Sequence, residues 1–335
     1  MTTAQSMHGS RHAPAPPTSW PRLLGVIIGL VALLTLILTA FAWPAVNTAP
    51  RDVPIVVTGL PSFVEQVRGT LDQAHPGAFE ITVVDDLTKA KEAIRSREAY
   101  GAVASGASGP RVLVASAASP TVAQALTQVS AALAAGQEGE TVEPPEDVVP
   151  TPADDPRGAG LGIGALPVAL AGVLCGAVLA LGVVGLGRRL LAGLLVAGLA
   201  GLAFVGVLDL WLGVLQGDLL LELAVAAGGL AATIIAMIGL GGLLGRPGLA
   251  LGAGTIILLG IPLSGATSAP EMLPEYWSEL GQALPPGAVL SLLRSVSFFD
   301  AAKWQQPTIV LGAWALGGLV LILLAALFAR RRAGR

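Results

Sequence analysis

Charged side chains are scarce in this sequence, and their scarcity excludes a soluble globular protein. Asp, Glu, Lys and Arg make up 12% of the 335 residues, about half the share found in typical soluble domains. Apolar residues make up 53%, and the mean hydropathy is +0.74. So few charges cannot cover a chain this apolar, and we therefore expect the lipid bilayer to surround much of it.

Cysteine and histidine are nearly absent, and so are the common catalytic motifs. The one cysteine, Cys175, excludes an intrachain disulfide and a cysteine-based zinc site. The histidines, at positions 8, 12 and 75, are too few and too scattered for zinc. The chain contains neither a phosphate-binding GxxxxGK followed by Ser or Thr nor a GxSxG nucleophile elbow. We therefore expect no enzyme activity, no catalytic residue, no metal or cofactor site and no nucleic-acid partner.

Six apolar runs reach the length of about 20 residues that a membrane span needs. They occupy residues 23–43, 160–186, 190–212, 219–245, 249–267 and 307–328. The sequence therefore predicts a polytopic α-helical membrane protein with six spans. The first run has an alternative interpretation as a signal peptide cleaved near Ala42, which would leave five spans. We interpret it as an uncleaved anchor, because its apolar stretch is longer than a usual signal core.

The arginines predict the orientation of these spans. Nine arginines and no acid lie before the first run, in two short loops and after the last run: Arg11, Arg22, Arg188, Arg189, Arg246, Arg330, Arg331, Arg332 and Arg335. Short arginine-containing loops remain in the cytoplasm. We therefore expect cytoplasmic tails at 1–22 and 330–335, with residues 44–159 outside a bacterial plasma membrane.

Glycine is abundant, with 43 residues, and some glycines recur four positions apart within the apolar runs. Such pairs share one helix face and let two backbones approach closely. We interpret them as helix-packing positions, with a gating hinge as the alternative. The pairs are Gly172 with Gly176, Gly241 with Gly245, and Gly248 with Gly252.

Residues 44–136 predict a small α/β domain between the first two spans. Short β-branched runs predict strands at 53–58, 79–84, 100–104 and 112–115. Helical periodicity predicts helices at 61–74 and 85–98, and a third helix that Ser119 caps, with Pro120 in its first turn. Residues 137–159 are acidic and rich in proline, and we expect a solvated linker without a core. A five-helix membrane domain at 160–329 follows.

Asp209 and Glu222 lie within or beside predicted spans, where ionisable side chains are candidates for function. Both are close to the external ends of their spans. One interpretation is a pair of hydrated carboxylates at the interface, and the other is a proton or cation site of a proton-coupled transporter.

The last external loop predicts an amphipathic hairpin at 270–299. The first helix would carry an apolar face comprising Leu273, Tyr276, Trp277, Leu280 and Leu284. Pro285 and Pro286 would end it. The second helix would bury Leu293 and its apolar neighbours, with Arg294 on the opposite face at the membrane interface, paired with lipid phosphate, Asp209 or Glu222. The hairpin would lie along the outer interface or dip inward as a re-entrant element. Pro285, Leu293 and Arg294 are therefore candidate gating residues beside Asp209 and Glu222.

This loop resembles the region before the last span of type-2 ABC exporter permeases, especially their YhgE/Pip (phage-infection-protein) relatives. The resemblance lies in the segments Pro262-Leu263-Ser264-Gly265, Glu271-Met272-Leu273-Pro274, Leu284-Pro285 and Leu293-Arg294. A second likeness lies in residues 83–90, Ile94 and Tyr100-Gly101-Ala102-Val103, which look like the strand-helix-strand of that family's external domain. The resemblance implies an exporter subunit, powered by a separate ATP-binding subunit and assembled as a homodimer or with a similar membrane partner.

Short cytoplasmic loops set this chain apart from such permeases. They comprise little more than residues 187–189 and 245–247, whereas such permeases engage an ATPase through cytoplasmic helices. A non-transporting scaffold or secretion accessory, whose external domain binds a partner, is therefore the main alternative. The sequence names neither the substrate nor the oligomeric state.

Overall fold

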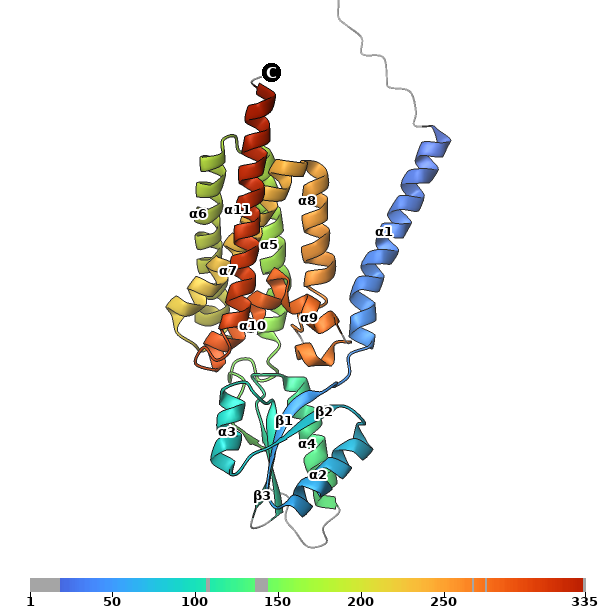
Figure 1. Ribbon diagram of the computed structural model, residues 1–335, viewed down its shortest axis with the longest axis vertical. Helices are drawn as coiled ribbons and strands as arrows, with labels where there is room; N and C mark the ends of the chain where they lie inside the picture. The colour runs from blue at the N-terminus through green and yellow to red at the C-terminus, as the bar shows by residue number, and fades with distance from the viewer. Residues whose placement is uncertain (1–18, 107–108, 136–143, 267, 275, 334–335) are drawn as a thin grey trace, which may run out of the picture.

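The computed structural model describes residues 19–106, 109–135, 144–266, 268–274 and 276–333. It comprises a helical bundle stacked end-on against a small α/β domain, with one long helix standing apart (Figure 1). The Pro-rich tail at 1–18 and the last two residues of the basic tail lie outside the described residues.

The α/β domain follows the predicted β-α-β-α-β-β-α order and adds one strand. Its sheet has the order β2-β1-β3-β4-β5; β1 is parallel to β2 and β3, whereas β4 is antiparallel to β3. The Ser119 Oγ accepts the Val122 N–H at the start of α4, so the predicted cap is present. The elements are β1 Val53–Thr58, α2 Pro61–Ala74, β2 Phe79–Val83, α3 Leu87–Arg95, β3 Gly101–Gly106, β4 Gly109–Val114, α4 Pro120–Ala135 and β5 Glu146–Asp147.

The acidic segment after this domain is partly folded, so the expectation of a linker without structure is wrong for its second half. Glu146 and Asp147 form β5, parallel to β4. The Glu146 carboxylate pairs with Lys91 at 2.5 Å and Arg111 at 3.4 Å. Asp155 accepts backbone N–H groups at the start of the next helix. The acidic composition of this segment indicated that it would be exposed to water. In the fold, neighbouring cationic side chains and backbone N–H groups bind these carboxylates instead.

Among the residues that the structure describes, five helices are long and apolar enough to cross a membrane. The chain is thus a multi-pass helical protein whose composition suits a bilayer. Helix α7 is central and packs against α5, α6, α8 and α11, whereas α1 is almost entirely exposed and lies apart from the bundle (Figure 1). The five are α1 Trp20–Val46, α5 Gly160–Gly182, α6 Leu186–Val205 continued by the π-helix η1 Gly206–Trp211, α7 Leu219–Leu244 and α11 Gln305–Ala333.

The predicted span at 249–267 is a shorter helix. The eight-residue α8, Arg246–Ala253, continues into the seven-residue π-helix η2, Gly254–Gly260. This helix is shorter than the about 20 residues that a span needs. The chain then turns at residues 261–264, which include Pro262, whose ring cannot continue a helical hydrogen-bond ladder.

The glycine pairs meet different environments. Gly172 and Gly176 face Thr233 and Met237 of α7 so closely that an added Cβ would collide, which is the predicted packing role. Gly245 instead ends α7 with φ +68° and faces open space. It supplies a left-handed turn rather than half of a helix-packing pair.

Candidate functional site

The segment at 270–299 lies between the bundle and the α/β domain. It forms η3 Pro270–Met272, α9 Trp277–Gln282 and α10 Pro285–Phe298. Pro285 and Pro286 occupy the first turn of α10, where their missing N–H groups leave no bond unmade. The predicted two helices are therefore present, but the first is shorter than expected, because Tyr276 has a left-handed backbone with φ +64°. Leu273 consequently lies outside it, and Leu280 is partly exposed.

Helix α10 is inserted into the end of the bundle rather than laid across it. Leu293 is fully buried within a cluster drawn from α5, α7 and α11. Val289 fills the space at Gly229 of α7, where a Cβ would collide with it. Gly229 lies about 15 Å along α7 from its first residue, at 1.5 Å per residue. The structure thus favours the inward-dipping arrangement over the surface one.

The far end of α10 reaches the α/β domain. Phe299 packs in that domain's core beside Ala90 and Ile94. In return, Ala269 and Met272, which precede α9, join the domain's other core cluster. The Arg51 Nη1 donates to the Met272 carbonyl at 3.0 Å. The two parts of the molecule are therefore held together by shared apolar cores and by a hydrogen bond from an arginine side chain to a backbone carbonyl.

Glu222 is buried at the contact between α7 and α10, so the hydrated interpretation is wrong for this residue. Its side chain is 0% exposed. Its Oε1 accepts the Ser297 Oγ–H at 2.6 Å and the Gly217 N–H at 2.9 Å. Its Oε2 accepts no hydrogen bond from the residues that the structure describes. Asp209 lies in η1 and remains partly exposed, as a hydrated carboxylate would.

Arg294 is also buried, which corrects its predicted place at a lipid interface. It is 7% exposed, and its charge interacts with Arg97, Tyr100 and Glu271 rather than with Asp209 or Glu222. Burial, reinforced by the like charge of Arg97, lowers the pKa of Arg294 to about 10. The polar face of α10 is covered because the α/β domain packs on it.

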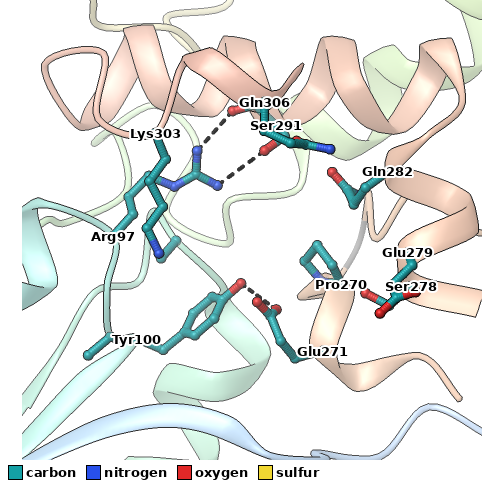
Figure 2. A pocket seen from close by; sticks show the side chains of 12 residues that line it. Arg97, Tyr100, Pro270, Glu271, Ser278, Glu279, Gln282, Ser291, Lys303 and Gln306 are labelled. Carbon is teal, nitrogen blue, oxygen red and sulfur yellow. Dashed lines mark hydrogen bonds between the residues drawn. The ribbon is translucent and has the colours of Figure 1, made fainter. Parts of the chain in front are cut away.

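A cavity of about 440 Å³ lies at this junction, and Figure 2 shows the side chains around it. The Arg97 Nη1 donates to the Ser291 carbonyl of α10 at 3.0 Å, and its guanidinium lies 5.6 Å from the Phe299 ring centre. The Tyr100 hydroxyl donates to Glu271 Oε2 at 2.7 Å. Burial and the Glu271 charge raise the pKa of Tyr100, so it remains a neutral donor. Burial also lowers the pKa of Arg97.

The structure brings together four of the five predicted candidates. Pro285, Leu293 and Arg294 share α10, and Glu222 contacts this helix through Ser297. Asp209 is not among them, and none of the five candidates lines the cavity.

Sequence reasoning missed Arg97, Tyr100 and Glu271 as site residues, although Tyr100 and Glu271 lie in segments that carry the family resemblance. The rarity of tyrosine, with two in the chain, was the available signal for Tyr100.

The arrangement is suited to binding and to mechanical coupling. Within the described ranges, no group of three His, Cys, Asp or Glu side chains could hold a metal ion. The cavity instead offers cationic, anionic and amide groups from both parts of the molecule. No protein-family model, curated protein or solved structure matches this chain.

Proposed function

We propose that this chain is a permease-like subunit of an exporter in a bacterial plasma membrane. It moves a substrate outward, is powered by a separate ATPase, and acts as a homodimer or with a similar membrane partner. The main support for the proposal is that α10 lies between the bundle and the α/β domain and contacts both. This helix is packed inside the bundle on one side and bonded to the α/β domain through Arg97 and Ser291 on the other. A movement of the domain would therefore move a helix that occupies the end of the bundle.

The proposed orientation places both termini in the cytoplasm and the α/β domain outside. The α5–α6 turn, the α7–α8 turn and the end of α11 lie at the end of the bundle away from the α/β domain (Figure 1). The arginines of these segments therefore gather on one side, which favours the cytoplasmic assignment. The helix formed by α8 and η2, together with the turn after it, returns the chain to the other end, as a sixth crossing would.

Cysteine labelling tests this orientation. In a Cys175→Ala background, single cysteines at Thr3 and Ala333 are expected to resist an impermeant maleimide in intact cells and to react after permeabilisation. A cysteine at Glu65, on the exposed surface of α2, is expected to react in intact cells. Labelling of either terminal cysteine in intact cells would refute the orientation.

Co-purification tests the exporter. We expect the tagged chain, solubilised from its native membrane, to retain an ATP-binding protein in roughly equal amount, identified by mass spectrometry. The double variant Arg188→Glu with Arg189→Glu, in the α5–α6 turn, should lose that protein because the charge of its docking surface is reversed. Arg68→Glu on the α/β domain is the matched control and should retain it. Recovery of the chain without an ATPase would count against the proposal.

The short turns favour a second candidate, a non-transporting scaffold. Helix α5 ends at Gly182 and α6 begins at Leu186, while α7 ends at Leu244 and α8 begins at Arg246. These turns offer little surface to an ATPase. A scaffold predicts that the same experiment recovers a partner through the α/β domain, in which case Arg68→Glu is the more disruptive variant.

A further inference from the structure

The junction cavity separates its charges by sign. Figure 2 shows Arg97 and Lys303 on one side and Glu271 and Glu279 on the other. No ion pair joins Lys303 or Glu279 to any residue in the described part of the chain. The volume of about 440 Å³ falls in the range of small-ligand pockets. A ligand that carries one positive and one negative group would satisfy both sides at once.

A second space, an apolar groove, lies along α11. The groove has a volume of about 600 Å³ and lies between α7, α8 and α11. Gln306 of α11 lines the cavity, and Ala313 and Gly317 line the groove. These residues are seven and eleven positions apart, so they share one face of the helix.

Trp314, which also lines the groove, reaches toward the cavity. Its indole N–H donates to the carbonyl of Ala283, next to the cavity residue Gln282. From Gln306 to Val320 at the far end of the groove, α11 rises about 21 Å. One leaflet of the hydrocarbon core is about 15 Å deep. A ligand with a polar head and a chain of leaflet length therefore has the length to occupy both spaces.

The aromatic side chains near the cavity are of the kind found at the level of lipid headgroups. Trp43 of α1 and Trp277 of α9 meet edge to face, with ring centroids 5.4 Å apart, and Trp304 is half exposed at the start of α11. Tryptophan is enriched at the boundary between membrane and water. Both Trp277 and Trp304 lie next to residues that line the cavity.

We propose that the cavity and the α11 groove together bind one phospholipid with a phosphoethanolamine headgroup. The phosphate pairs with Lys303 and Arg97, the ammonium donates to Glu279 and Glu271, and an acyl chain lies along Ala313 and Gly317. Phosphatidylglycerol lacks the ammonium, and phosphatidylcholine lacks N–H donors, so neither satisfies the acidic side. The site requires no transport activity and is independent of the exporter proposal.

Native mass spectrometry of the full chain tests the site. Protein purified in mild detergent and exposed to equimolar phosphatidylethanolamine, phosphatidylglycerol and phosphatidylcholine should retain phosphatidylethanolamine at about tenfold excess or more, the value of one charge-assisted hydrogen bond. Glu279→Gln should reduce that excess by a similar factor, because it removes the acceptor of the ammonium. Lys303→Gln should instead weaken the retention of all three lipids, because each of them carries the phosphate. Free phosphoethanolamine, added as a competitor, should displace little lipid, because it lacks the chain.

Two glycine variants on α11 distinguish the loss of lipid caused by filling the groove from the loss caused by any added leucine on this helix. A Cβ added at Gly317 or at Gly312 would meet no heavy atom within 4 Å, so both positions should accept leucine with unchanged thermal unfolding. Gly317→Leu fills the groove and should abolish lipid retention, whereas Gly312→Leu, on another face, should not. Equal retention of the three lipids, equal loss in both glycine variants, or displacement by free phosphoethanolamine would each overturn the proposal.

Discussion

Replacing Leu293 by Asp is expected to destabilise the membrane bundle by more than about 4 kcal/mol. Leu293 is fully buried in the cluster that joins α10 to α5, α7 and α11. The variant loses the buried side chain and introduces a carboxylate without a partner in apolar surroundings. We expect a large loss of protein from the membrane fraction, and a much lower midpoint of thermal unfolding for the protein that is recovered.

The matched control is Leu293→Met, which preserves volume and polarity and should cost less than about 1.5 kcal/mol. The α/β domain should keep its fold in the Asp variant, because its core clusters have no fully buried residue in common with the cluster around Leu293 and share with it the partly buried Phe298. Protease resistance of that domain measures this directly. A Leu293→Asp protein that unfolds at the wild-type temperature would mean that α10 is not packed in the bundle.

Replacing Gly318 by Val is expected to push α11 away from α7 and to cost about 3 kcal/mol. A Cβ at Gly318 would lie 2.6 Å from the Ala236 backbone nitrogen, and backbone atoms cannot rotate away. The contact is reciprocal, since a Cβ at Gly239 would lie 2.5 Å from the Gly318 carbonyl oxygen. Thermal unfolding in detergent measures the loss.

Gly312→Val is the control for this variant, because the same helix has open space there. It should change stability by no more than about 0.5 kcal/mol, as surface substitutions do. If the two variants were equally stable, α7 and α11 would not be in backbone contact, and the arrangement of the bundle would have to be revised.

Local patterns carried much of the architecture. Charge scarcity and apolar runs predicted the membrane class because a bilayer imposes its length on each helix. The order of strands and helices in the domain was predicted from apolar residues that recur every two positions in a strand and about every 3.6 positions in a helix. This spacing arises because each element buries one face. The break before α10 followed from Pro285, since the missing N–H group acts on its own turn.

Three of the predictions that were wrong concern charged residues. The sequence predicts Arg294 at a lipid interface because it lies opposite the apolar face of an amphipathic helix, yet the α/β domain covers that face. Glu222 was interpreted as hydrated because of its depth, yet Ser297, 75 positions away, and Gly217 hold it inside the protein. The sequence predicts Glu146 in a solvated linker, yet its carboxylate forms ion pairs with Lys91 and Arg111.

The sequence by itself determined that this is a helical, multi-pass protein with an α/β domain and a proline-started helix before its last long helix. Only the tertiary structure decided that α10 enters the bundle, that Glu222 and Arg294 are buried, and that Arg97, Tyr100 and Glu271 surround a cavity. The reason is physical. Apolar side chains that are buried on one face recur along a helix or strand, so they can be recognised from the local sequence. A buried charge instead depends on partners from distant segments, which come together only when two parts of the molecule dock.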